Sequence, residues 1–195
     1  RDWSSDVCSS DLSAWVDNVA GGALAAAHLL SLGHRHIGIV RGNSHLSAPW
    51  SVPDDRSTGF RNALATAGAQ LDDRLVVDGR FSIQGGRVAM NELLSLPSPP
   101  TAVFCMSDEM AFGALQAVRE RGLTPGTDIS VIGFDDHPVS ESVGLTTVRQ
   151  RVRQIGRLGA QTMIGLLNGT TNALHHEVEL TLVTRSSTGP LAGNH

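Results

Sequence analysis

The sequence of 195 residues has no lysine, no tyrosine and only two cysteines. We interpret the absence of lysine and tyrosine as codon bias of a GC-rich genome and draw no function from it. Two cysteines build no disulfide framework, and Cys105 lies in an apolar run that predicts a buried free thiol in a reducing compartment. The 15 basic residues, all arginine, are outnumbered by 19 acidic ones, so the net charge of -4 does not fit a nucleic-acid-binding surface. The longest weakly polar stretch, 19–32, is too short to span a bilayer and contains His28.

Motifs for catalysis and metal binding are also missing. The sequence has no Gly-rich phosphate loop, no Gly-x-Ser-x-Gly elbow and no nucleophile triad, which argues against an enzyme. The histidines His34, His36, His175 and His176 lack a cysteine or carboxylate partner at metal-ligand spacing, so we expect no metal and no cofactor. The basic cluster within 149–157 is interpreted as a solvated face or a subunit contact, with a phosphate site as the alternative.

The first twelve residues, RDWSSDVCSSDL, stand apart from the rest. They are rich in serine and aspartate and follow neither a helical nor a strand period. They closely resemble the in-frame translation of a sequencing-library adapter, so we interpret residues 1–12 as an assembly artefact outside the fold. The alternative is an ordinary disordered N-terminus. On the first interpretation the natural protein continues upstream of Ser13.

From residue 17 onward, helical and strand patterns alternate along the chain. Helices are predicted at 17–32, 54–67, 82–96, 107–121 and 152–167, and strands at 37–40, 75–77, 101–106, 129–134 and 178–182. This alternation predicts an α/β fold with a parallel sheet. Ligands of such sheets bind at the carboxyl ends of the strands, which here precede Arg41, 79–81, 107–108 and 135–136.

Five motifs then follow one another along the chain. They are SLGHRHIGIV at 31–40, DDRSTGFRNAL at 54–64, TAVFCMSDEMAFGALQAVRERGLTPGTDISVIGFDDHP at 101–138, LTTVRQ at 145–150 and TRSST at 184–188. No single motif is decisive. Their order and spacing together resemble the ligand-sensing region of the lac repressor (LacI/GalR) family over nearly all of residues 17–188.

The resemblance implies a type I periplasmic-binding-protein-like fold, with two lobes of parallel sheet flanked by helices and a ligand cleft between the lobes. It implies an incomplete first lobe formed by 13–41 and 145–180, a second lobe formed by 42–144 and 181–190, and a tail at 191–195. The helix-turn-helix and the hinge of the family have no counterpart in the sequence. The chain alone is therefore not expected to bind an operator by the family's mechanism.

The resemblance also implies five ligand contacts. Arg56 matches the arginine of the family's Arg-x-x-Gly-Phe helix start and offers a rigid fork of donors to sugar hydroxyls. Asp135 matches the first aspartate of the Gly-Phe-Asp-Asp turn, and its carboxylate accepts hydrogen bonds from hydroxyls. Ser107 stands where the family often has asparagine, and Phe81 aligns with an aromatic residue that often stacks on the ligand. Trp50, in a loop rich in serine and proline, is the fifth candidate.

Each of these contacts has a structural alternative. Arg56 would otherwise be a surface residue paired with Asp54 or Asp55, and Phe81 would belong to the core. Asp135 would bond to the backbone of its own turn, and Ser107 would only cap the helix that it precedes.

Three neighbouring residues are given other roles. Asp108 is expected to stabilise the N-terminus of its helix, and Asp136 is expected to be structural. His137 replaces a residue that is often threonine in the family, and its role is left open.

The function implied by the resemblance is that of the effector-binding domain of a cytoplasmic, sugar-responsive transcriptional repressor. A sugar or related effector would shift an open–closed equilibrium of the two lobes in a homodimer. Operator DNA would be bound only through the missing N-terminal domain. The alternative is a periplasmic sugar-binding protein of an ABC transporter, which shares the fold and carries a secretion signal.

Overall fold

The computed structural model of the chain describes residues 13–42, 52–170 and 175–191, and these residues form two compact units. The larger unit consists of the described residues within 18–149 and 181–191. The smaller unit consists of those within 13–17 and 150–180. None of the helices in these ranges combines the length and the apolarity that crossing a bilayer requires.

The larger unit is built on a six-stranded sheet with the order β3-β2-β4-β5-β6-β8. Its strands are β2 (Ile37–Arg41), β3 (Val76–Asp78), β4 (Ala102–Cys105), β5 (Ser130–Asp135), β6 (Thr146–Arg149) and β8 (Thr181–Val183). The first five pair in parallel, and β8 pairs antiparallel with β6. The predicted α/β fold with a parallel sheet is confirmed, with one antiparallel strand added at its edge.

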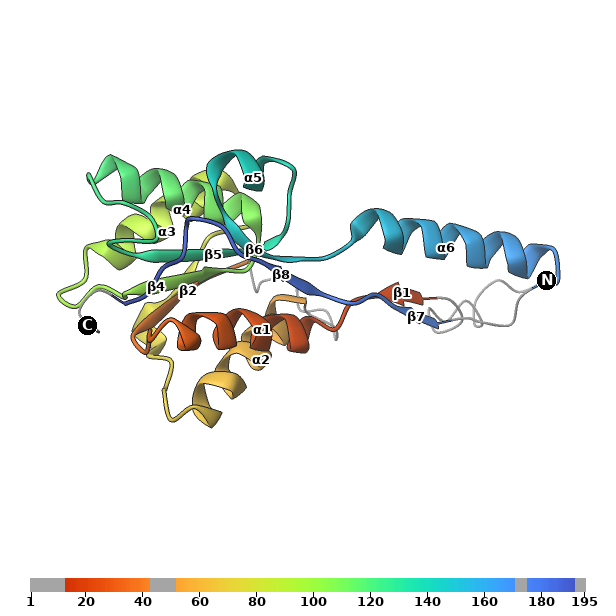
Figure 1. Ribbon diagram of the computed structural model, residues 1–195, viewed down its shortest axis with the longest axis horizontal. Helices are drawn as coiled ribbons and strands as arrows, with labels where there is room; N and C mark the ends of the chain where they lie inside the picture. Colours follow the sequence, from red (N-terminus) through yellow and green to blue (C-terminus); the bar gives the residue numbers. More distant parts are fainter. Residues whose placement is uncertain (1–12, 43–51, 171–174, 192–195) are drawn as a thin grey trace, which may run out of the picture. The chain divides into compact units, whose positions relative to one another are not determined.

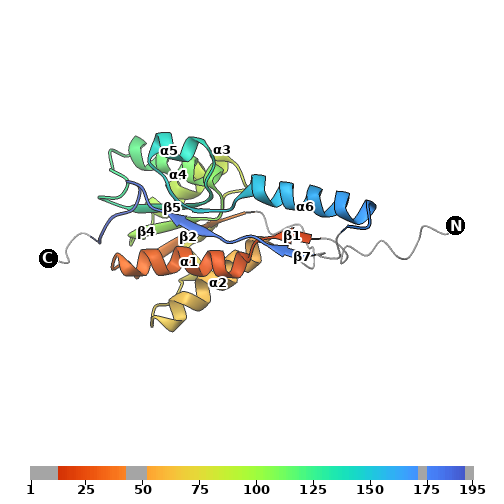
Figure 2. The same ribbon diagram turned by 45° about the vertical axis from the view of Figure 1, so that its right-hand side comes forward.

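Helices cover both faces of this sheet. They are α1 (Asn18–Ser31), α2 (Val52–Thr66), α3 (Ile83–Leu94), α4 (Asp108–Glu120) and the short α5 (Val139–Val143), and a 3-10 turn spans Asp73–Leu75. Figures 1 and 2 show α1 and α2 together on one face and α3 and α4 together on the other. Central strands buried on both faces are typically apolar throughout, as β4 is here. Phe104 of β4 stacks on Phe60 of α2, with ring centroids 5.0 Å apart.

The chain reverses its direction across the sheet between β2 and β4. It leaves β2 through α2 to reach β3 at one edge, and then returns past β2 through α3 to form β4. The carboxyl ends of β2 and β4 therefore flank a topological switch point, the place where open α/β sheets bind their ligands.

The Leu-Gly-His motif joins α1 to this sheet. Gly33 ends α1 with a φ of 89°, which its missing side chain allows. The ring of the buried His34 lies 3.0 Å from the hydroxyls of Thr101 and Ser130 and from the carbonyl oxygen of Gly189. His34 thus holds the start of two strands and the C-terminal segment together.

The smaller unit contains one helix and a two-stranded sheet. Strands β1 (Ser13–Trp15) and β7 (His175–Glu177) pair in parallel, and α6 (Val152–Leu167) packs on β1. Both histidines of β7 have polar partners, because His175 Nδ1 lies 2.9 Å from Ser13 Oγ and His176 Nε2 lies 2.8 Å from Thr162 Oγ1. Several apolar side chains of α6 are exposed, among them Val152, Met163, Ile164 and Leu167.

Two sequence predictions about organisation differ from the structure. The predicted boundary put 13–41 and 145–180 in one lobe, yet α1, β2 and β6 belong to the larger unit, because β2 and β6 pair with strands of its sheet. The single strand predicted at 178–182 is also wrong. The chain passes between the units after residue 180, so β7 pairs with β1 on one side and β8 pairs with β6 on the other.

Candidate ligand-binding site

Arg56 is the best-enclosed of the predicted site residues. It lies on the first turns of α2, where Gly59 of α2 and Gly22 of α1 let the two helix backbones touch. A Cβ at Gly59 would lie 1.8 Å from the carbonyl oxygen of Val19, and one at Gly22 would lie 2.0 Å from that of Arg56. Only 5% of Arg56 is exposed, so the alternative of a surface arginine is wrong.

The guanidinium of Arg56 reaches the carboxyl ends of β4 and β5. Its Nη1 donates to the carbonyl oxygen of Met106 at 2.5 Å, and its Nε donates to Oδ1 of Asn18 at 2.9 Å. Its central carbon lies 3.6 Å from the centroid of the Phe134 ring, a cation–π contact. Its Nη2 lies 3.9 Å from Oδ1 of Asp135. The structure therefore brings two of the predicted ligand contacts together.

Burial lowers the pKa of Arg56 to about 10, while the charges of Asp135 and Asp108 act to raise it. The group stays charged at neutral pH, because its pKa is still well above 7. A buried cation with a carboxylate beside it, at the carboxyl ends of parallel strands, is a typical recognition element for a polar ligand.

Asp135 is the last residue of β5 and begins a strained turn. Its φ is 124° and that of Asp136 is 56°, and neither residue is glycine. Such conformations cost about 1–3 kcal/mol each and persist only where the surroundings hold them. The turn gives Asp135 a side chain that is 32% exposed, so it faces Arg56 and remains open to solvent.

Asp136 has a separate role, as predicted. Its carboxylate accepts from Nε of Arg149 at 2.6 Å and from Nη2 of Arg185 at 2.8 Å. Burial raises the pKa of Asp136, but the bonds from the two arginines outweigh that effect and lower it. Arg149, which the sequence analysis placed in a basic cluster, is therefore an ion-pair partner of Asp136. Asp136 ties the turn to the end of β6 and to the segment that follows β8.

Ser107 is confirmed as the cap of α4. Its Oγ accepts from the backbone N–H of Met110 at 3.3 Å, and the residue is buried. A serine cap keeps its own O–H free to donate elsewhere. The ligand contact predicted for Ser107 therefore stays a prediction that its capping role permits.

Phe81 lies at the carboxyl end of β3 with 40% of its surface exposed, so the alternative of a core residue is wrong. Its ring covers Gly42, where an added Cβ would lie 1.9 Å from a ring carbon. Arg80 and Phe81 have φ values of 52° and 47°, a left-handed turn without glycine. The turn places an apolar ring face at the end of β2, next to the switch point. Trp50, the fifth candidate, lies outside the described residues.

The sequence analysis expected Asp108 only to stabilise the N-terminus of its helix, but the structure also gives it partners outside that helix. It is 1% exposed and accepts three hydrogen bonds, from the backbone N–H of His137 at 2.8 Å and from the hydroxyls of Ser140 and Thr147, both at 2.6 Å. Burial raises its pKa to about 6, and the three hydrogen bonds act to lower it. The sequence signal was an aspartate directly after an apolar strand, but nothing in it indicated these partners.

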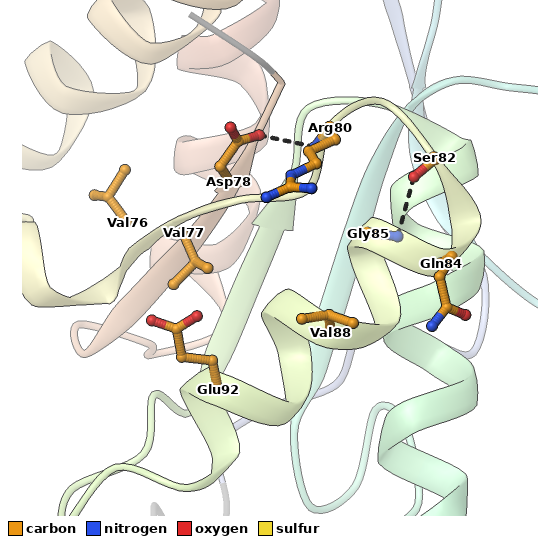
Figure 3. A pocket seen from close by; sticks show the side chains of 9 residues that line it. All are labelled: Val76, Val77, Asp78, Arg80, Ser82, Gln84, Gly85, Val88 and Glu92. Carbon is orange, nitrogen blue, oxygen red and sulfur yellow. Dashed lines mark hydrogen bonds between the residues drawn. The ribbon is translucent and has the colours of Figure 1, made fainter.

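A pocket of about 520 Å³ is lined by β3, by α3 and by the loop that joins them (Figure 3). Val77 of β3 and Val88 of α3 line it together with the polar side chains of Asp78, Arg80 and Glu92. Its lining includes no predicted ligand contact. Among the described residues, no group of three or more histidines, cysteines or acidic residues is placed to hold a metal ion.

Comparison with known proteins agrees with this arrangement. Residues 26–188 match the family of periplasmic binding protein-like domains. The ribose operon repressor of Haemophilus influenzae is 36% identical over 174 residues, which cover 88% of this chain and 51% of that protein. A LacI-family regulatory protein from Chloroflexus aggregans superposes with a TM-score of 0.82 at 32% identity, covering 92% of this chain and 64% of that one. A LacI-family regulator from Enterococcus faecium, solved with bound ribose, has a TM-score of 0.81 at 32% identity, covering 91% and 65%.

The chain spans about half the length of the curated relatives it matches. The match covers the six strands of the larger unit's sheet and helix α2, which together carry the arrangement of Arg56 and Asp135. By fold and by sequence, the chain belongs to the family of periplasmic binding protein-like domains, and the two solved structures that it resembles here are LacI-family regulators.

Proposed function

We propose that the chain is the effector-binding domain of a LacI-family transcriptional repressor and that its ligand is a sugar or a related polyhydroxylated molecule. The observation that carries the proposal is the buried guanidinium of Arg56 facing Asp135 at the carboxyl ends of β4 and β5, beside the switch point of the sheet. A buried cation beside a partly exposed anion offers donors and acceptors to the same hydroxylated ligand.

Each predicted contact has a distinct part in this proposal. Arg56 donates two hydrogen bonds to adjacent hydroxyls, and Asp135 accepts from another. The exposed ring of Phe81 packs against the C–H face of the sugar. Ser107 donates its hydroxyl proton while its oxygen caps α4, and Trp50, which lies outside the described residues, is kept as the fifth ligand contact.

Calorimetric titration of the chain with ribose, other pentoses, hexoses, disaccharides and nucleosides tests the proposal. At least one compound is expected to bind. Arg56→Met and Asp135→Asn should each weaken that binding by about 1.5–3 kcal/mol, roughly 10- to 150-fold, as for lost charge-assisted hydrogen bonds. Arg61→Met is the matched control, because Arg61 lies on the same helix and pairs with the exposed Asp73. Absence of binding by every compound, or equal binding by all variants, would contradict the proposal.

The wider role is part of the same proposal. We propose that the chain acts in the cytoplasm as part of a homodimer, performs no catalysis, and is joined to operator DNA through a segment outside these 195 residues. The repressors that it resembles support this role, and the exposed apolar side chains of α6 support the idea that the smaller unit is the remnant of a first lobe.

Sequencing the source locus upstream of the codon for Ser13 tests this wider role. An in-frame helix-turn-helix ahead of a completed first lobe is the expected result. A secretion signal in that position would instead make the chain part of a transport binding protein.

A further inference from the structure

The turn after β5 needs a support that the proposed ligand contacts do not supply. Asp135 and Asp136 both have positive φ values, and the site depends on the direction in which this turn points Asp135. Arg149 and Arg185 hold the side chain of Asp136. The part-buried backbone N–H groups that follow Asp135 have partners of their own, which fix the direction of the turn.

Both of these N–H groups are oriented through Asp108. The N–H of His137 donates directly to Oδ2 of Asp108 at 2.8 Å. The N–H of Asp136 donates at 3.3 Å to Oγ1 of Thr147, and that hydroxyl in turn donates to Oδ1 of Asp108 at 2.6 Å. One buried carboxylate therefore fixes two successive peptide planes directly after Asp135.

The fold leaves space for this carboxylate at a single glycine of β5. A Cβ at Gly133 would lie 2.2 Å from Oδ1 of Asp108. A glycine within a strand often marks the close approach of another group, and here that group is the carboxylate that supports the turn two residues later. If Asp108 served only the N-terminus of α4, its oxygens would face the first N–H groups of that helix. Its hydrogen bonds instead go to His137, Ser140 and Thr147.

We propose that Asp108 is a positioning residue that holds the turn from Asp135 to His137 and thereby sets the Asp135 carboxylate against Arg56. The proposal rests on the proposed function only in regarding the Arg56–Asp135 pair as a ligand site. The bond geometry that it describes exists without any ligand.

Amide hydrogen exchange measured by NMR on the chain without ligand tests this role. Asp108→Ala should speed exchange at the amides of Asp136 and His137 by at least about tenfold, since each loses its support. It should also move the Nε–H resonance of Arg56. Ser140→Ala is the matched control, because Ser140 is the one of the three partners that neither belongs to the turn nor accepts from one of its amides. It should leave both amides within about threefold of wild type.

A second pair of variants keeps the test decisive if Asp108→Ala unfolds the domain, which faster exchange throughout β4 would reveal. Thr147→Val keeps the shape of the side chain and should accelerate the amide of Asp136 alone, and Thr147→Ser should restore its protection. Wild-type exchange at Asp136 in Thr147→Val, or equal acceleration in Ser140→Ala, would overturn the proposal. Since no ligand is present, these results stand even if every sugar titration fails, so failure of the function and failure of the positioning role are distinguishable.

Discussion

Replacing Arg56 with methionine should separate folding from binding. The buried guanidinium has a pKa of about 10, against an ordinary value of 12.5. At about 1.4 kcal/mol per pKa unit, the folded state disfavours the charged form by about 3 kcal/mol. Arg56→Met removes this cost, keeps a long unbranched side chain and does not lower the helix propensity of α2 appreciably.

The stabilising interactions that Arg56→Met removes are similar in size to this burial cost. The cation–π contact with Phe134 accounts for about 1–2 kcal/mol, and the acceptors on Met106 and Asn18 lose donors at about 1 kcal/mol each. The ion pair with Asp135 adds little, because the two atoms are 3.9 Å apart and the carboxylate remains partly exposed. Gains and losses nearly cancel, so the free energy of unfolding should lie within about 1 kcal/mol of wild type while ligand binding is lost.

Urea unfolding followed by circular dichroism measures this difference, with Arg61→Met as the control. Arg61 is on the same helix, and its exposed pair with Asp73 should be worth less than about 0.5 kcal/mol. The free energy of unfolding of Arg56→Met could instead fall more than about 3 kcal/mol below that of Arg61→Met. The ion pair would then be a stabilising element of the fold. The argument that the charge is retained for ligand recognition would then fail.

Three further substitutions test other parts of the site and its support. Gly133→Ala should destabilise the chain by about 1–3 kcal/mol in urea unfolding, because the new Cβ overlaps Oδ1 of the pinned Asp108 carboxylate; no change would mean that the carboxylate is free to move. Gly42→Ala should displace the exposed ring of Phe81 and weaken sugar binding in calorimetry, with less than about 1 kcal/mol lost in stability, since the ring can swing into solvent. Burial lowers the pKa of His34, so the unfolded chain binds its proton first and the stability contributed by His34 falls as pH drops below about 6.5; the difference in melting temperature between wild type and His34→Gln should therefore narrow from pH 7.5 to pH 5, and a constant difference would exclude this linkage.

The sequence predicts well those strands and helices whose buried side chains are apolar. The run of β4 is buried on both faces, so its strand was evident from hydrophobicity alone. β6 gave no such signal, because Thr146 and Thr147 occupy its buried positions. Their polarity is compatible with burial only because Thr146 Oγ1 lies within hydrogen-bonding distance of the carbonyl oxygen of Arg185 and Thr147 donates to Asp108. Those partners are distant in sequence, so no local pattern reveals them.

In the candidate site too, the sequence predicts some residues, and it misses those whose role depends on partners distant in the chain. Motif resemblance selected Arg56 and Asp135, and the fold places their charged groups 3.9 Å apart. Resemblance could not select Asp108, because an aspartate in the first turn of a helix has the same sequence pattern whether it faces solvent or a neighbouring strand. Its role depends on β5 and β6 lying side by side under α4, with Gly133 leaving room for the carboxylate. The glycine and the first aspartate of the Gly-Phe-Asp-Asp motif thus serve one purpose from two sides: the glycine admits the support, and the aspartate is what that support holds in place.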